Sequence, residues 1–284
     1  MKLGYLFVTA VIGVMLIFAS TGICQEKLTA NELVEKTGQG SINWTAGYVE
    51  AAGMGIASDQ TVAKINSRPV ALRAAKENAS GYLLEMVKNV QIDSARKVND
   101  FMLESDVVDA QINGIVQRAV IADQLYMPDG TVEVKIRVPI YGELSNIILP
   151  AAFTKMNLKN EASSASAAPP TVTYSGIVVD ARGTGIRPAM IPKIFDEAGK
   201  EIYSLASVDI RYAVRQGMSG YARDLEAAQK NERVAVNPLI VRAIKSAGAA
   251  KTDLIISNAD AGRIKNAVQS ELLLKQCRVL IVAD

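Results

Sequence analysis

Residues 171–196 read TVTYSGIVVDARGTGIRPAMIPKIFD and mark the place where one predicted domain gives way to the next. Residues 174–179 are rich in aromatic and β-branched side chains, residues 180–188 are dense in glycine, arginine and proline, and residues 189–195 are apolar again. Aromatic and β-branched runs favour strands, whereas glycine and proline favour loops. The stretch therefore predicts two strands joined by a charged loop.

The charged loop at residues 180–188 is the candidate site of the chain. The residues in it that could contact a ligand or a partner are Asp180, Arg182, Gly183, Gly185 and Arg187. A nucleotide-binding loop needs a third glycine, or a Gly-Lys-Ser/Thr ending at the start of a helix, and here Pro188 and a predicted strand follow instead. We expect a structural loop in which the glycines supply positive φ and the charged side chains pair. Binding of an anion or a glycan by the two arginines stays open as the alternative.

The first 24 residues have the composition of a secretory signal peptide, with one early lysine, a long apolar run and small residues at the end. Residues 21–24, TGIC, resemble the box at which lipoproteins are cleaved, but that box requires a small residue where Ile23 stands. Cleavage between Cys24 and Gln25 is therefore favoured. We expect a periplasmic or secreted protein without a spanning helix in its mature form. An outer-membrane lipoprotein anchored through Cys24, and retention of the segment as an anchor, are the less favoured alternatives.

Composition argues against an enzyme. The chain contains no histidine, which removes Ser-His-Asp and Cys-His hydrolases and histidine-ligated metals. Beyond Cys24 the chain holds one more cysteine, Cys277, so the mature protein forms no internal disulfide. The apolar neighbours of Cys277 favour a core residue over a nucleophile. A pair of carboxylates stays a formal alternative, but no local arrangement of Asp and Glu suggests one. We expect no catalytic residue, no cofactor and no metal.

The charges of the chain are nearly balanced, with 31 Lys and Arg against 29 Asp and Glu. A nucleic-acid-binding domain normally carries a net basic patch, and the sequence has neither a long basic run nor aromatic side chains between basic ones. We therefore expect no nucleic-acid partner. The length of 284 residues and the hydrophobic content of 49% fit two domains, each with its own core.

The first predicted domain covers residues 41–150. Residues 41–56 alternate as a strand does, and residues 67–90 carry apolar side chains at helical spacing, with Ser67 as the predicted cap and Pro69 in the first turn. The small side chains of that helix would let it lie close against a sheet. Residues 107–126 predict a short helix or bulged segment that leads into a strand. Residues 131–141 alternate almost without error after a turn. An antiparallel sheet packed on one long helix is the economical fold.

A linker and a second domain follow. Residues 159–170, KNEASSASAAPP, cannot bury a core and are predicted to be the linker. In residues 171–284 we expect a mixed α/β domain, with a hairpin turn at 197–200, a helix at 237–247, a strand at 254–256, a helix after Asn258 and a central final strand at 277–282. The last three elements have the order of a βαβ crossover. The whole chain is thus predicted to be an α+β protein.

Several groups of residues in the first domain resemble the N-terminal domain of bacterial envelope proteins related to flagellar assembly proteins T and P and to small surface lipoproteins. These groups are AGY at 46–48, the alanine-rich helix at 71–90, Gly114, Tyr126, DGTVEV at 129–134 and IYG at 140–142. Residues 176–203, GIVVDARGTGIRPAMIPKIFDEAGKEIY, also resemble a block that follows this domain in uncharacterised exported proteins. The resemblance implies a structural or assembly role at the outer membrane or the flagellar base, and it carries over no catalytic residues.

Two classes of function follow from these observations. The first is a non-enzymatic envelope protein with a structural or assembly role, whose partners are envelope or flagellar-base proteins or a second copy of the chain. The second is a periplasmic binding module that holds an anionic glycan or peptidoglycan through Arg182 and Arg187. An enzyme is the least favoured class, because the sequence offers no nucleophile with an adjacent base.

Overall fold

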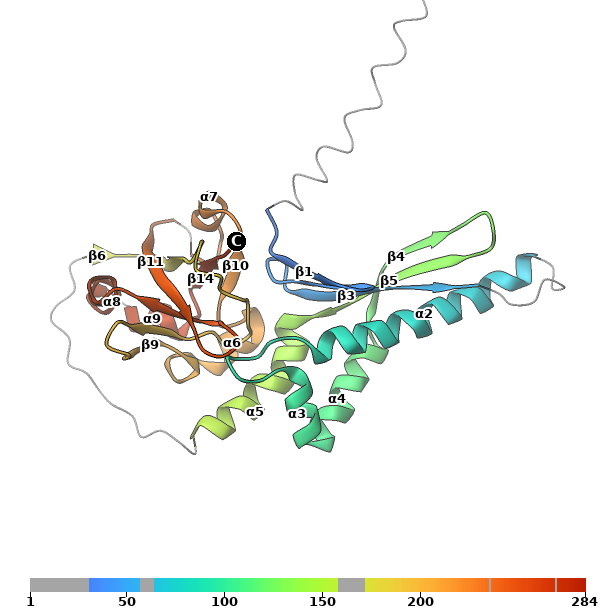
Figure 1. Cartoon of the computed structure of the whole chain (residues 1–284), viewed down its shortest axis with the longest axis horizontal. Helices are drawn as coiled ribbons and strands as arrows, with labels where there is room; N and C mark the ends of the chain where they lie inside the picture. The colour runs from blue at the N-terminus through green and yellow to red at the C-terminus, as the bar shows by residue number, and fades with distance from the viewer. Residues whose placement is uncertain (1–30, 57–63, 158–171, 235, 269) are drawn as a thin grey trace, which may run out of the picture. The chain divides into compact units, whose positions relative to one another are not determined.

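A long helix covers an antiparallel sheet in the N-terminal segment, as predicted. The computed structural model describes residues 31–56, 64–157, 172–234, 236–268 and 270–284. Helix α2 (Lys64–Lys88) lies along one face of a five-stranded sheet with the order β1-β2-β3-β5-β4 (Figure 1). The strands are β1 (Val34–Thr37), β2 (Gly40–Asn43), β3 (Tyr48–Gly55), β4 (Val120–Tyr126) and β5 (Val132–Pro139).

Two of the predicted segments lie outside the described residues. These are the signal peptide at residues 1–24 with its cleavage site between Cys24 and Gln25, and the linker at residues 159–170. Residues Leu33–Asp284 form one compact unit that includes both the N-terminal segment, up to residue 157, and the C-terminal segment, from residue 172. Independent folding of the two segments stays a prediction.

Small residues set the distance between α2 and the sheet. Ala71, Ala75 and Ala79 are fully buried on the helix. A Cβ atom added to Gly53 of β3 would lie 2.3 Å from the main-chain oxygen of Ala75 and 2.3 Å from the main-chain nitrogen of Ala79. The strand and the helix are therefore in main-chain contact, which only glycine on one side and alanine on the other allow. The expectation that the alanines let this helix lie close against a sheet is confirmed.

Strand β5 alternates between a buried and a partly exposed face, as its sequence predicts. The side chains that it buries are those of Val132, Val134, Ile136 and Val138. The strand pairs with β3 on one side and with β4 on the other, antiparallel in both cases. Because α2 packs on both β3 and β5, the buried face of β5 is the face that this helix covers.

The single strand predicted for residues 41–56 is wrong, because a turn divides it into β2 and β3. At the turn, Asn43 Oδ1 accepts a hydrogen bond from the Ala46 N–H at 2.8 Å, and Gly47 has a φ of +73°. Trp44 lies in the turn but is only 1% exposed. Because this large apolar side chain is buried, the alternation of apolar and polar residues continues through the turn. The sequence pattern alone therefore does not reveal the turn.

The helices of the N-terminal segment also depart from prediction in part. Helix α2 includes Ser67 and Pro69 within its length, so the predicted cap at Ser67 is wrong. The helix expected near residue 107 is α4 (Asp106–Gln117), which Ser105 caps. Helices α3 (Val98–Glu104) and α5 (Ser145–Asn157) were not predicted.

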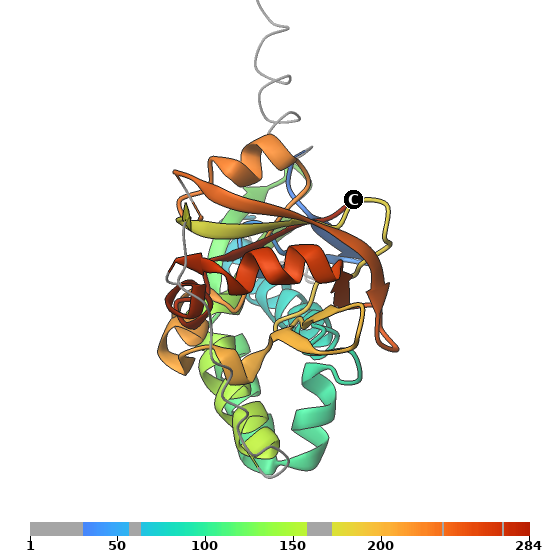
Figure 2. The same cartoon turned by 90° about the vertical axis from the view of Figure 1, so that its left-hand side faces the viewer.

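A mixed seven-stranded sheet forms the C-terminal segment. Its order is β10 (Gly220–Ala222), β14 (Val279–Val282), β7 (Gly176–Asp180), β11 (Pro238–Ala247), β12 (Asp253–Ile256), β8 (Ile194–Asp196) and β9 (Glu201–Tyr203). The first four strands are parallel. Helices α7 (Leu225–Gln229) and α8 (Asn258–Lys265) lie on opposite faces of this sheet (Figure 2), while α6 (Ile210–Gln216) and α9 (Ser270–Lys275) complete the segment.

Two predictions for this segment are wrong. The predicted helix at residues 237–247 is strand β11, which pairs in parallel with β7 and antiparallel with β12. Since β12 therefore runs against β14, the expected βαβ crossover between these two strands does not exist. The strand expected at 189–195 is shorter, β8, whereas the hairpin turn at 197–200 is confirmed. The final strand, expected to be central and to cover 277–282, is β14; it begins at Val279 and lies inside the sheet, next to the outer strand β10.

Tyr141 joins the N-terminal segment to the C-terminal one. Its hydroxyl donates a hydrogen bond to the Ser219 main-chain oxygen at 3.3 Å. A Cβ atom on Gly47 would lie 2.5 Å from the Tyr141 ring, and one on Gly217 would lie 2.2 Å from it. The ring thus occupies the space between two glycines. Main-chain hydrogen bonds from Met190 and Ile191 to the loop at 91–92 add to this contact.

Candidate functional site

The predicted loop begins at the carboxyl end of β7, where Asp180 and Arg182 form an ion pair. Arg182 Nε donates to Asp180 Oδ1 at 2.8 Å, and the second guanidinium nitrogen donates to Oδ2 at 2.7 Å. These hydrogen bonds hold the pKa of the Asp180 carboxyl below its ordinary value. In turn, the Asp180 carboxylate raises the pKa of the Arg182 guanidinium. The pairing agrees with the expected structural loop.

The two glycines of the loop have the left-handed main-chain conformation that the structural interpretation requires. Gly183 has a φ of +78° and Gly185 a φ of +66°. The Gly183 N–H donates a hydrogen bond to the Asp284 carboxylate, which ties the loop to the end of β14. Arg187 does not line the cavity beside Arg182, and its guanidinium lies 3.9 Å from Glu35 of β1 instead. The structure therefore does not bring Arg182 and Arg187 together around one ligand.

A cavity of about 440 Å³ opens beside Arg182 and Gly183. It is lined by Arg182, Gly183, Thr184, Arg242, Ala243, Ile244, Ser257 and Asp260. The edge formed by the carboxyl ends of parallel strands is where α/β proteins commonly bind ligands. Arg242 was not among the predicted site residues, since its segment was expected to be helical. The pairing of Arg242 with Asp180 in the register of β11 and β7 places it here.

The charges around this cavity are mixed. Arg182 is compensated by Asp180, and Asp260 is paired with Arg263 at 2.8 Å. Arg242 is exposed, and within the described residues it forms no hydrogen bond or ion pair. The cavity therefore offers one cation without a hydrogen-bonded partner, Arg242, whose charge also helps to lower the pKa of the nearby Asp180 carboxyl.

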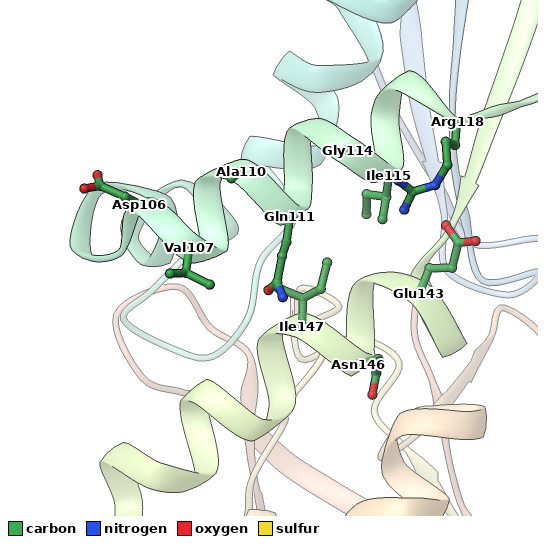
Figure 3. Close-up of a pocket in the computed structure, with 10 residues that line it drawn as sticks. All are labelled: Asp106, Val107, Ala110, Gln111, Gly114, Ile115, Arg118, Glu143, Asn146 and Ile147. Atoms are coloured by element: carbon green, nitrogen blue, oxygen red, sulfur yellow. The ribbon is translucent and has the colours of Figure 1, made fainter.

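Sequence reasoning missed a larger groove, of about 680 Å³, between α4 and the start of α5. Ten residues line it (Figure 3). Asp106, Val107, Ala110, Gln111, Gly114 and Ile115 belong to α4, Arg118 directly follows that helix, and Glu143, Asn146 and Ile147 form the other wall. The α4 residues recur every three or four positions and so share one face of the helix. The sequence shows this spacing, but the opposite wall of the groove includes the start of α5, a helix that was not predicted. The groove could therefore not be found from the sequence.

Several polar side chains of this groove have no partners among the residues that the structure describes. Among the described residues, the side chains of Gln111, Arg118, Glu143 and Asn146 form no hydrogen bond or ion pair. In Figure 3, Arg118 and Glu143 point towards each other from opposite walls, and Gln111 points across the groove towards Ile147. The groove thus combines free hydrogen-bonding groups with apolar surface, which is the usual composition of a binding site.

A third surface is the free edge of the five-stranded sheet. Among the described residues, strand β4 pairs only with β5. It has seven residues, whereas the other outer strands of the two larger sheets, β1, β9 and β10, have three or four. Its side chains Val120, Leu125 and Tyr126 are 66%, 54% and 45% exposed. Met54 of β3 lies in the same row as Leu125 and is 56% exposed. An outer strand with exposed apolar side chains is a surface on which another chain can pair.

Cys277 is buried, as the sequence predicts, and burial raises the pKa of its thiol to about 11. In the part of the chain that the structure describes, no three Cys, Asp or Glu side chains are grouped so that they could hold a metal ion. No helix among the described residues has the length and apolar character needed to cross a membrane.

Comparison with known proteins identifies one related domain. Residues 176–284 match the family described as the second domain of Treponema pallidum Tp0624. The match begins at Gly176, the first residue of β7 and of the block that resembled a domain of uncharacterised exported proteins. No curated protein matches the chain. The C-terminal segment is therefore similar to that second domain, and the match covers less than half of the chain.

Proposed function

We propose that this chain is an exported, non-enzymatic protein of the bacterial envelope, with a structural or assembly role that depends on binding other proteins. The observation that carries the proposal is the free edge of β4, because its main-chain groups and the exposed side chains of Val120 and Leu125 can bind a partner strand. The absence of histidine from the sequence and the signal-like residues 1–24 support the non-enzymatic and exported parts of the proposal.

The place of action follows from the resemblance of residues 41–145 to proteins of the flagellar base and the outer membrane. Gly47 and Tyr141, which belong to the motifs that carry this resemblance, lie in contact where the N-terminal and C-terminal segments meet. We therefore propose the flagellar base or the outer membrane as the place of assembly, in a periplasmic or secreted form.

Fractionation and pull-down of a tagged protein from the source bacterium test the role. We expect envelope proteins, or an untagged second copy, to be recovered with the wild-type protein but not with a Val120→Glu/Leu125→Glu variant. Leu272→Glu is the matched control, because Leu272 is an exposed leucine on α9, far in sequence from β4. Recovery of the same proteins with all three forms would contradict a role for the β4 edge.

The second candidate function is a binding module for an anionic glycan or peptidoglycan. It is favoured by one observation, the exposed guanidinium of Arg242 at the carboxyl edge of the C-terminal sheet, which forms no hydrogen bond or ion pair among the described residues. We expect such a module to be retained on purified peptidoglycan and an Arg242→Ala variant to elute earlier. Equal elution of the two proteins would exclude this site.

A further inference from the structure

We propose that the groove between α4 and α5 binds an extended peptide segment of about five residues that carries a basic side chain. The groove volume of about 680 Å³ is within the range of ligand-binding sites, roughly 300 to 1,000 Å³. Asp106, the first residue of α4, and Arg118, the residue after its last, mark the two ends of the groove. Twelve helical steps separate these two residues, about 18 Å at 1.5 Å per residue. An extended chain covers that distance with about five residues at 3.3 Å each.

The amide side chains indicate that the ligand presents its main chain. Gln111 and Asn146 stand on opposite walls, and each carries both a hydrogen-bond donor and an acceptor. An extended peptide offers unpaired N–H and C=O groups on both of its sides, which such amides match. A helix has already satisfied most of its main-chain groups internally, so it would leave these amides without partners. An extended segment is therefore the better fit.

Charge decides which peptide fits. The lining of the groove contains two carboxylates, Asp106 and Glu143, and one cation, Arg118. This net negative charge disfavours polyanions such as nucleic acids and phosphorylated segments. None of the ten lining residues is aromatic, so the groove offers no stacking surface for nucleobases. A basic side chain on the peptide would complement Asp106, which lies at the end of the groove away from Arg118.

Apolar contact would supply the remaining affinity. Val107 is 67% exposed beside the groove, and Ile115 and Ile147 form part of its wall. Small or medium apolar side chains of the peptide would cover this surface. The groove is a different surface from the edge of β4. An experiment that excludes one of them as a binding site therefore leaves the other untouched.

Selection of random seven-residue peptides displayed on phage, against the purified chain without residues 1–24, tests the proposal. Selected peptides would be synthesised with a fluorescent label and their Kd measured by anisotropy. We expect enrichment of peptides with a basic residue, and at least a tenfold weaker Kd for a Gln111→Ala/Asn146→Ala variant, since two hydrogen bonds are lost. Gln117→Ala is the matched control, because Gln117 is an exposed glutamine at the end of α4 that does not line the groove.

A second readout tests whether the peptide binds through its main chain. Methylation of single main-chain nitrogens of a selected peptide should abolish binding at one or two positions and leave the other positions unaffected. Because the substituted residues are exposed, circular dichroism should show the same fold for all variants. Lack of enrichment over a surface without protein, or equal Kd values for the wild-type protein and the double variant, would overturn the proposal.

Discussion

Replacement of Gly53 by alanine tests the main-chain contact between β3 and α2 on which the N-terminal fold depends. The added Cβ atom would lie 2.3 Å from main-chain atoms of Ala75 and Ala79, where an ordinary carbon contact needs about 3.5 to 4.0 Å. The helix must therefore move away from the sheet by more than about 1 Å. Overpacking of a well-packed core costs about 1 to 3 kcal/mol, and we expect the upper part of this range because main-chain atoms, not a flexible side chain, must move.

The matched control is Gly81→Ala, within α2. A Cβ atom at Gly81 meets nothing within 4 Å, so the substitution tests only the helical preference of the two residues. Alanine is favoured over glycine inside a helix by about 1 kcal/mol, and we expect this variant to be more stable than the wild-type protein. The free energies of unfolding of the two variants should therefore differ by about 2 to 4 kcal/mol.

Urea unfolding followed by circular dichroism measures both free energies on the chain without residues 1–24. The Gly53→Ala protein should unfold at a lower urea concentration than wild type, and the Gly81→Ala protein at a higher one. If the two variants had equal midpoints, α2 would not lie in main-chain contact with β3, and the packing described for the N-terminal segment would be wrong.

Three further predictions concern the C-terminal segment. Gly183→Val should lower the free energy of unfolding by about 1 to 2 kcal/mol, because φ is +78° at this position. Arg182→Ala should lower it by only about 0 to 1 kcal/mol, because it removes an ion pair at the surface. Thermal melting that ranks the two variants the other way would contradict this. NMR titration should place the pKa of the Asp180 carboxyl below its ordinary value of 3.8, and Arg182→Ala should raise that pKa. The wild-type protein therefore loses the stability that the pair contributes as the pH falls through the folded-state pKa. The same pKa in both proteins would refute the pairing. Burial raises the pKa of the Cys277 thiol to about 11. In a chain that lacks residues 1–24, this thiol should react with a thiol reagent at pH 8 only after urea unfolding. A fast reaction of the folded protein would show that the thiol is accessible and contradict its burial.

Local patterns predicted the N-terminal segment well because its main elements have a strong periodicity of their own. Apolar residues at helical spacing gave α2, and alternation gave β5. The turn at Trp44 was missed, because a buried side chain there imitates a continuing strand. Helix α5 was missed as well, and it contains Pro150, a residue that usually argues against a helix.

Strand β11 shows why the C-terminal segment was harder to predict. Asn237 precedes it, Pro238 is its first residue and Gly248 follows it, and residues of these types often begin and end a helix. Its pairing with β7 and β12, from distant parts of the chain, makes it a strand instead. Local sequence carries no record of such pairings.

The candidate site was predictable only in part, for the same reason. The positive φ values of Gly183 and Gly185 and the pairing of Asp180 with Arg182 follow from the local composition of the loop. The position of Arg242 depends on the register of β11, which the sequence does not display. The groove between α4 and α5 depends likewise on two helices meeting in space.

Site-specific photo-crosslinking in the source organism tests the proposed assembly role most directly. A photoreactive amino acid would replace Leu125 on the free edge of β4. In a second protein it would replace Leu272 on α9, which is also an exposed leucine. We expect a discrete crosslinked product with an envelope protein or a second copy of the chain from position 125 and none from position 272. No product from position 125, or the same product from both positions, would contradict it.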